Sequence, residues 1–281
     1  MTTQFLETME TKLNTRNIKQ ITINGYMNGL RNLRINVKST SKTIKFFKRT
    51  DKIKVYLDSV ENLNTRKNIL KPILNLLKDE PKLQDTYQFY YLINKDLVNK
   101  INKKIGENKF TKKETKNKIT WLDVINIKPE GLDEKIYHSL LVNDNVFIRL
   151  EHFNIKLDEY DEKTDNYIDG PFLFMNSFKN VKSFGPHKIN LSDETTDIIE
   201  NIRGSWLVSN HGISQSGRGK WITRFFKKRT GKSVNNNLLR KIYINHVLKS
   251  LPNITNNQIT ERAKKMLNSK ETWINTYRKV N

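Results

Sequence analysis

The sequence predicts a mainly α-helical protein with one small β-hairpin, which is an α+β fold class. Apolar residues recur every three or four positions through most of the 281 residues, and this spacing gives a helix one apolar face. Two short segments within residues 172–191 are instead typical of strands. A polar, lysine-rich stretch at residues 94–119 interrupts the apolar pattern and predicts a division into two domains.

The first predicted domain, residues 1–93, is a small helical bundle with one basic side. Helical periodicity covers five segments: 3–15, 20–36, 42–48, 51–60 and 64–78. Asn64 and Thr65 are candidates to cap the last segment. Basic residues lie between the apolar positions: Lys42, Lys45, Lys48, Arg49, Lys52, Lys54, Arg66, Lys67 and Lys71. Such a face either contacts phosphates or is simply solvated, and the pattern fits both.

Residues 94–115 are interpreted as a linker or a long exposed helix, and residues 116–281 as the second domain. Five helices are predicted in this domain before its last fifty residues. The first begins at Trp121, the second covers 132–142, and the third contains Val146 to Phe153 and is capped by Asn143–Asn145. The fourth is capped by Ser192, and the fifth covers 214–228. The predicted hairpin pairs Phe172–Met175 with His187–Leu191 across a lysine-containing turn.

The last fifty residues contain two helical patterns and a final short one. The first places Leu239, Tyr243 and Val247 on one face and ends at Leu251-Pro252-Asn253. The second contains Ile259, Ala263 and Met266 and ends at Asn268-Ser269. The short helix after it contains Trp273, Ile274 and Tyr277.

Charge and composition narrow the functional classes. The chain has 51 Lys and Arg against 29 Asp and Glu, a net charge of +22, which favours polyanions such as nucleic acid. An AT-rich genome, which inflates lysine and asparagine codons, is the alternative explanation. The absence of cysteine excludes disulfides, thiolate zinc sites and a cysteine nucleophile, and the five histidines lack paired metal-ligand spacing. No phosphate-binding loop motif, membrane helix or secretory leader is found, so we expect an intracellular protein without nucleotide or metal cofactors.

The C-terminal block resembles box II of the tyrosine recombinase (phage-integrase-like) family. That box has a His-x-x-Arg helix, then a Leu-Gly-His segment, and then a nucleophilic tyrosine. Here Asn237-Leu238-Leu239-Arg240 stands at His-x-x-Arg, and Asn268 lies nine residues before Tyr277, where the second histidine would be.

Two further segments carry the resemblance. Arg149-Leu150-Glu151 corresponds in position to the family's first catalytic arginine, although the usual Gly-Leu-Arg string is missing. Asn176-Ser177-Phe178-Lys179, followed by Gly185, is similar to the hairpin that carries a catalytic lysine in viral and mobile-element members. We prefer Lys179 for that role, with Lys182 as second choice. The N-terminal bundle is similar to the family's core-binding domain only loosely.

The resemblance implies a catalytic domain that cleaves and rejoins double-stranded DNA through a 3′-phosphotyrosyl intermediate, without ATP or metal. Tyr277 would be the nucleophile, Arg149 and Arg240 would bind the phosphate, and Lys179 would protonate the leaving 5′-oxygen. Asn237 and Asn268 can donate hydrogen bonds but cannot shuttle protons; His211 and His246 are nearby substitutes in sequence. The family also implies a homotetramer on two DNA sites, found wherever its DNA is: nucleus, cytoplasm or viral factory.

Two alternatives remain. The two asparagines fit a DNA-binding protein on a recombinase fold that has lost catalysis, and a type IB topoisomerase would use the same chemistry. The helical N-terminal bundle favours a recombinase over a topoisomerase. The basic, asparagine-rich composition and the hairpin string suggest that the chain comes from a virus or mobile element.

Overall fold

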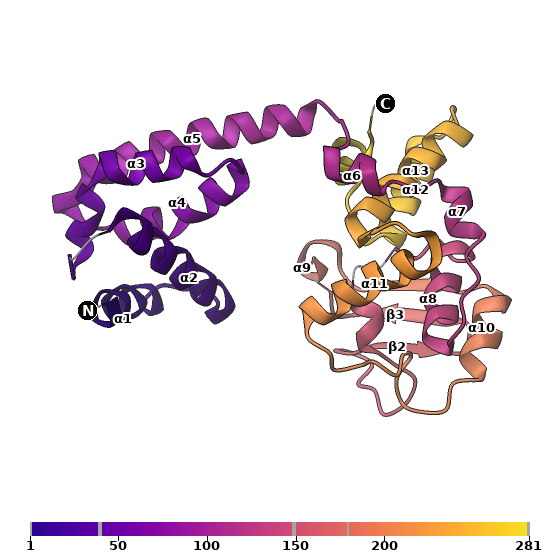
Figure 1. Cartoon of the computed structure of the whole chain (residues 1–281). Helices are drawn as coiled ribbons and strands as arrows, with labels where there is room; N and C mark the ends of the chain where they lie inside the picture. Colours follow the sequence, from indigo (N-terminus) through magenta and orange to yellow (C-terminus); the bar gives the residue numbers. More distant parts are fainter. Residues whose placement is uncertain (1, 39–40, 148–149, 179, 280–281) are drawn as a thin grey trace. The chain divides into compact units, whose positions relative to one another are not determined.

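The computed structural model describes residues 2–38, 41–147, 150–178 and 180–279. It confirms the predicted fold class, because helices dominate and the strands form one four-stranded sheet (Figure 1). The chain divides into two units, Met1–Glu107 and Asn108–Asn281. Their boundary lies inside the 94–115 segment that the sequence marked as a linker.

The N-terminal unit is a helical bundle around an aromatic centre. Its elements are α1 (Thr2–Asn14), α2 (Gln20–Val37), the 3₁₀ helix η1 (Ile44–Lys48), α3 (Thr50–Ser59), α4 (Leu63–Leu77), η2 (Pro81–Leu83) and α5 (Gln84–Gly106). Phe5, Phe46 and Phe47 contact one another in the core, and the Tyr90 hydroxyl donates to the Phe47 carbonyl at 2.8 Å. The five predicted segments are confirmed within two residues, except that 42–48 is a 3₁₀ helix.

Details at two ends of these helices differ from the prediction. Asn62 caps α4, rather than Asn64 or Thr65, because its side chain accepts both of their backbone N–H groups. Residues 94–106 form the last part of α5, where Leu97 and Ile101 are buried. These residues are therefore helical, as the alternative of a long helix predicted, but the helix buries two apolar residues and is not exposed throughout.

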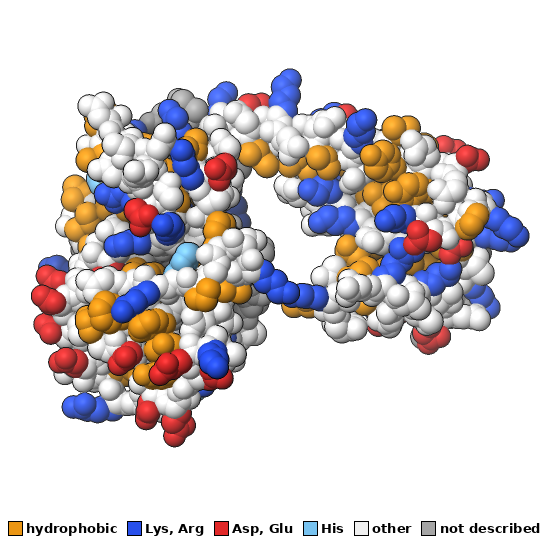
Figure 2. Space-filling model, turned by 180° about the vertical axis from the view of Figure 1, so that it is seen from behind, with side chains coloured by type: hydrophobic (Ala, Val, Ile, Leu, Met, Phe, Trp, Pro, Cys, Tyr) orange, Lys and Arg blue, Asp and Glu red, His pale blue; other side chains and the backbone are white. Residues whose placement is uncertain are grey.

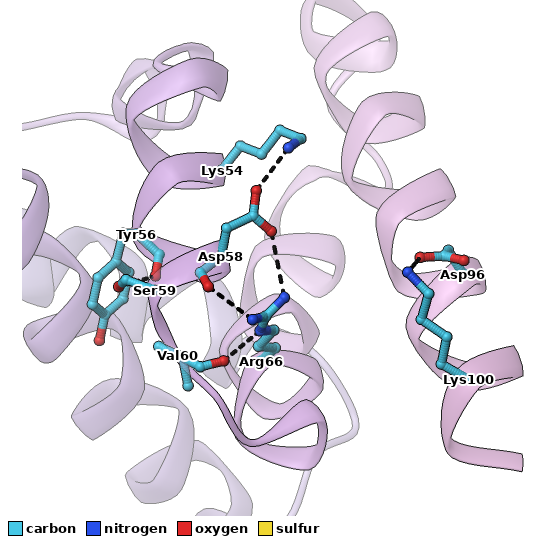
Figure 3. Close-up of polar contacts among 8 residues, drawn as sticks. All are labelled: Lys54, Tyr56, Asp58, Ser59, Val60, Arg66, Asp96 and Lys100. Atoms are coloured by element: carbon cyan, nitrogen blue, oxygen red, sulfur yellow. Dashed lines mark hydrogen bonds and ion pairs between the residues drawn. The ribbon is translucent and has the colours of Figure 1, made fainter. Parts of the chain in front are cut away.

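Arg66 holds the junction between α3 and α4 (Figure 3). Its guanidinium donates to the carbonyls of Asp58, at 2.8 Å, and Val60, and it also pairs with the Asp58 carboxylate, which Lys54 contacts from the other side. These carbonyls are at the C-terminal end of α3, where a cation is favoured. Arg66 therefore stabilises the bundle, whereas Lys42, Lys45, Lys48, Lys52 and Lys71 are exposed.

The C-terminal unit contains a sheet of strands in the order β1 (Ile155–Lys156), β2 (Asn166–Asp169), β3 (Phe172–Met175), β4 (His187–Asn190). The predicted hairpin is confirmed: β3 and β4 pair antiparallel, with Leu173 opposite Ile189. The short helix α9 (Val181–Phe184) lies in the connection. The sequence analysis missed β1 and β2; β2 joins β3 through a tight turn at Gly170, which has a φ of +55°.

The predicted helix from Val146 to Phe153 is wrong. Asn145 has a φ of +55°, Val146 and Phe147 are in irregular backbone, and a 3₁₀ helix, η3, covers Glu151–Asn154. Asp144 does not cap a helix that follows it. Its carboxylate accepts from the Ser192 backbone N–H at 2.6 Å and the Thr195 hydroxyl at 2.5 Å, at the start of a distant helix.

The remaining helices of this unit are α6 (Lys112–Asn117), α7 (Trp121–Ile125), α8 (Leu132–Val142), α10 (Asp193–Glu200), α11 (Gln215–Thr230), α12 (Asn236–Ser250), α13 (Asn256–Lys265) and α14 (Lys270–Thr272). The helix α8 lies between two cores. Its residues Tyr137 and Leu141 pack with α11, α12 and α13, whereas Ile136 and Leu140 pack with the sheet. Among the helices of the described ranges, none is long and apolar enough to cross a membrane.

Candidate functional site

Arg240 is the centre of the candidate site. It lies in α12, one turn after the Asn235 cap, and is fully buried at 0% exposure. Its guanidinium donates to the backbone carbonyl of Phe147, which is 93 residues away in sequence. Its Cζ atom lies 5.9 Å from the centroid of the Tyr277 ring. Arg240 therefore joins three segments: α12, the irregular segment at Phe147, and the C-terminal turn that carries Tyr277.

Tyr277 lies in a π-helical turn, η4 (Trp273–Tyr277), and is 6% exposed. Such turns are rare and are often found at functional sites, because the extra residue changes the direction of the side chains that follow. Asn245 of α12 fixes the end of the turn: its amide donates to the Tyr277 carbonyl at 3.3 Å, and its oxygen accepts from the Lys279 N–H at 3.0 Å. The sequence analysis missed Asn245, which has no motif around it.

The two asparagines occupy different environments. Asn237 is exposed near the N-terminus of α12, three residues before Arg240. Asn268 is 4% exposed, and its side-chain nitrogen has no hydrogen-bond partner among the described residues. A buried donor of this kind is costly unless a ligand satisfies it. Leu267 precedes it with a φ of +52°, a conformation that favours glycine.

Arg149 and Lys179 lie outside the described residues. Their described neighbours are held in place by the sheet and by the centre of the site. Phe147 contacts Arg240, and Phe178 is buried, with its ring 5.7 Å from that of His187. Asn166 of β2 accepts from the backbone N–H groups of Asn176 and Ser177 and donates to the Ser177 carbonyl, which fixes the chain after β3. Lys182, the second choice, is exposed in α9.

Charge in the C-terminal unit is segregated along the chain. Residues 203–281 contain 17 basic residues (Lys and Arg) and two acidic ones (Asp and Glu). Residues 157–200 contain four basic and ten acidic residues. The helix α11 exposes Lys220, Arg224, Lys227 and Lys228, and a hollow of about 500 Å³ lies along Lys220, Thr223 and Arg224. Two basic residues of this helix are paired with carboxylates: Arg229 with Glu130 and Glu134, and Lys228 with Glu130. The segment that carries Arg240 and Tyr277 is thus the strongly basic one.

The two histidines that the sequence offered as substitutes contact other aromatic residues. His211 stacks on Trp206 at 4.8 Å, and His246 is exposed, with its ring 6.3 Å from that of Trp121. The structure gives neither of them a contact with Arg240 or Tyr277. Among the residues that the structure describes, no group of three or more His, Asp or Glu could hold a metal ion.

Because His152 is buried, we expect the stability of the fold to depend on pH. Burial, assisted by the nearby Arg218, lowers its pKa to about 3, and neither ring nitrogen has a hydrogen-bond partner in the described part of the chain. The unfolded state therefore binds a proton below pH 6.5 while the folded state does not. The contribution of His152 to the free energy of unfolding is therefore fully present above pH 6.5. It is lost as the pH falls toward 3, by at most about 1.4 kcal/mol per pH unit.

We expect His152→Phe to remove this slope, because phenylalanine keeps the ring packing against Tyr137 and Trp221 without titrating. The measurement is urea unfolding of both proteins at pH 7 and pH 5, which compares the loss of unfolding free energy in each. An equal loss in the two proteins would show that other groups cause the acid sensitivity.

No family model matches the chain, and no curated protein matches it. Among solved structures, the crystal structure of XerA recombinase is similar to this chain with a TM-score of 0.40 and 14% identity, over 100% of this chain and 94% of that one.

Proposed function

We propose that this protein cleaves and rejoins DNA strands, with Tyr277 as the nucleophile and Arg240 as a phosphate-binding group. The observation that carries the proposal is the position of the buried Arg240 guanidinium, 5.9 Å from the centroid of the Tyr277 ring. Arginine keeps its positive charge and offers a planar fork of donors that suits phosphate oxygens. A phosphodiester at this place would lie next to both a permanent cation and a phenol.

The chemistry follows from these groups. The Tyr277 oxygen attacks phosphorus, a P–O bond to tyrosine forms, and the bond to the 5′-oxygen breaks, which leaves a 3′-phosphotyrosyl link. The reverse attack by a 5′-hydroxyl restores the phosphodiester, so no external energy source is needed. Arg240 neutralises charge on the non-bridging oxygens with a planar donor fork. Arg149 is proposed as a second such group, and Lys179 as the proton donor to the 5′-oxygen.

The two asparagines are proposed to bind rather than to transfer protons. The Asn268 amide is buried without a hydrogen-bond partner among the described residues, so it suits a non-bridging oxygen as acceptor. Asn237 is exposed near the start of α12, where backbone N–H groups favour an anion. The basic residues of α11 would extend DNA contact along the flanking backbone.

The test is covalent attachment to DNA. A nicked duplex whose short 5′ fragment diffuses away after cleavage traps the intermediate, and a library of such duplexes replaces an unknown target site. We expect a protein–DNA adduct on a denaturing gel for the natural chain and none for Tyr277→Phe. The matched control is Tyr91→Phe, at a tyrosine that is 42% exposed in the N-terminal unit, which should leave the adduct unchanged. An adduct that persists in Tyr277→Phe would identify a different nucleophile.

A DNA-binding protein without catalysis is the second candidate, because Asn237 and Asn268 stand where the resembled family has proton-transferring residues. It predicts salt-sensitive DNA binding with no adduct on any duplex. Relaxation of supercoiled plasmid without joining of two sites would instead indicate a topoisomerase. For recombination itself we propose four copies on two DNA sites, which sedimentation with DNA would measure.

A further inference from the structure

One face of the sheet carries a row of aromatic side chains. Strand β3 alternates, so Leu173 and Met175 are buried in the core while Phe172 and Phe174 are half-buried on the other side. Tyr167 of β2 stacks on Phe174 at 4.6 Å and 11°, and Tyr160 stacks on Tyr167 at 4.2 Å and 8°. Tyr167 is only 6% exposed between these two rings, so Tyr160, Phe172 and Phe174 supply the accessible ring surface, which we call the aromatic face.

Carboxylates surround this face. Residues 157–170 contain six Asp and Glu and one Lys, in a chain whose net charge is +22. Asp169 lies opposite Phe172 in the β2–β3 pair, and burial together with the nearby Asp169, Glu162 and Asp158 raises the pKa of the Tyr160 hydroxyl. All three are exposed. Figure 2 shows hydrophobic side chains with acidic ones around them on the lower part of this unit, the level of β2 and β3 in Figure 1.

Lys188 of the same chain already contacts two rings of the aromatic face. The Lys188 Nζ atom of β4 lies 3.5 Å from the centroid of Phe172 and 5.3 Å from that of Phe174. Aromatic faces attract cations in this way, and arginine adds flat stacking and paired hydrogen bonds to carboxylates. The surface therefore offers both of the groups that bind a guanidinium, side by side.

We propose that the aromatic face binds an arginine-rich segment of another protein. The surrounding carboxylates repel nucleic acid, and a purely apolar partner would bury them without counter-ions. The guanidinium groups of a basic protein segment would stack on the rings and pair with the carboxylates at the same time. This inference goes beyond the proposed function and does not depend on it, because none of its residues belongs to the proposed strand-transfer site.

The experiment measures binding of a fluorescein-labelled all-arginine nonapeptide to the full chain by anisotropy, at low and at physiological salt. We expect the combined substitutions Asp158→Asn, Glu162→Gln and Asp169→Asn to weaken binding by about tenfold or more. The matched control neutralises three exposed carboxylates of α10 (Glu194→Gln, Asp197→Asn and Glu200→Gln), which changes the net charge equally. It should shift the affinity by about twofold at most.

Two further arms test the aromatic contribution. An all-lysine nonapeptide should bind several-fold more weakly than the arginine peptide. Lys188→Ala should tighten arginine binding more than Lys163→Ala does, because it also uncovers Phe172 and Phe174. Thermal melting checks that each variant is folded.

Equal weakening by the two triple variants, or no peptide binding, would overturn the proposal. So would salt-sensitive self-association of the chain alone that only the Asp158, Glu162 and Asp169 variant abolishes, since the occupant would then be a second copy.

Discussion

Replacing Arg240 with lysine is expected to slow formation of the protein–DNA adduct by about a hundredfold or more. The guanidinium donates to the Phe147 carbonyl and lies against the Tyr277 ring. Lysine keeps the positive charge, but its compact ammonium lacks the planar fork that holds the carbonyl and a phosphate in fixed directions. The measurement is the single-turnover rate of adduct formation on the nicked duplex at saturating protein.

Three readouts separate a role in chemistry from a role in folding. The melting temperature of Arg240→Lys reports stability, the salt-dependent affinity for DNA reports binding, and the adduct rate at saturation reports the chemical step. The control is Arg203→Lys, at an exposed position outside α11, which should leave all three nearly unchanged. If Arg240→Lys lowers stability while the rate per folded molecule stays normal, the arginine is structural and the proposed mechanism fails at its centre.

Much of the helical framework could be predicted from the sequence because its determinants are local. The apolar spacing of Leu239, Tyr243 and Val247, the Ser192 cap of α10, and the alternation of β3 each depend on residues within a few positions. Such signals depend little on the rest of the fold. The helix predicted at 132–142 has the observed bounds.

The missed features depend on residues far apart in the chain. Asp144 was interpreted as part of a cap for the next helix, but its carboxylate accepts hydrogen bonds from Ser192 and Thr195, about fifty residues later in the chain. The two-residue strand β1 is too short to show alternation. Asn245 holds the Tyr277 turn only because the chain returns to α12 after 32 residues.

The candidate site also combines features that the sequence predicts with features that depend on long-range contacts. The spacing between Asn237, Arg240, Asn268 and Tyr277 is visible in the sequence, but the contact of Arg240 with Phe147 is not. The sequence also gives no sign that Leu267 takes a left-handed conformation before Asn268, because leucine at that position carries none of the turn preference of glycine. Motif spacing therefore predicted candidates, and long-range packing determines how they lie.

Trp273→Ala is expected to destabilise the C-terminal unit by about 3–5 kcal/mol and to abolish the adduct. Trp273 is fully buried in the core that joins α12 and α13, and its indole N–H contacts the Met266 sulfur at 3.1 Å. It begins the π-helical turn that ends at Tyr277. Removing it leaves a cavity under this turn, so the Tyr277 side chain loses its fixed position beside Arg240.

The measurement is urea unfolding followed by tryptophan fluorescence, which reports the C-terminal unit because all four tryptophans lie in it. Trp273→Phe keeps an aromatic ring in the core and should cost less stability, with a slower but measurable adduct rate. Trp206→Ala is the control for losing a tryptophan, since Trp206 is only half-buried at the sheet edge. If Trp273→Ala retains the normal adduct rate under conditions where it is folded, Tyr277 does not need this turn to reach the phosphate. The nucleophile would then be positioned by Asn245 and α12 alone.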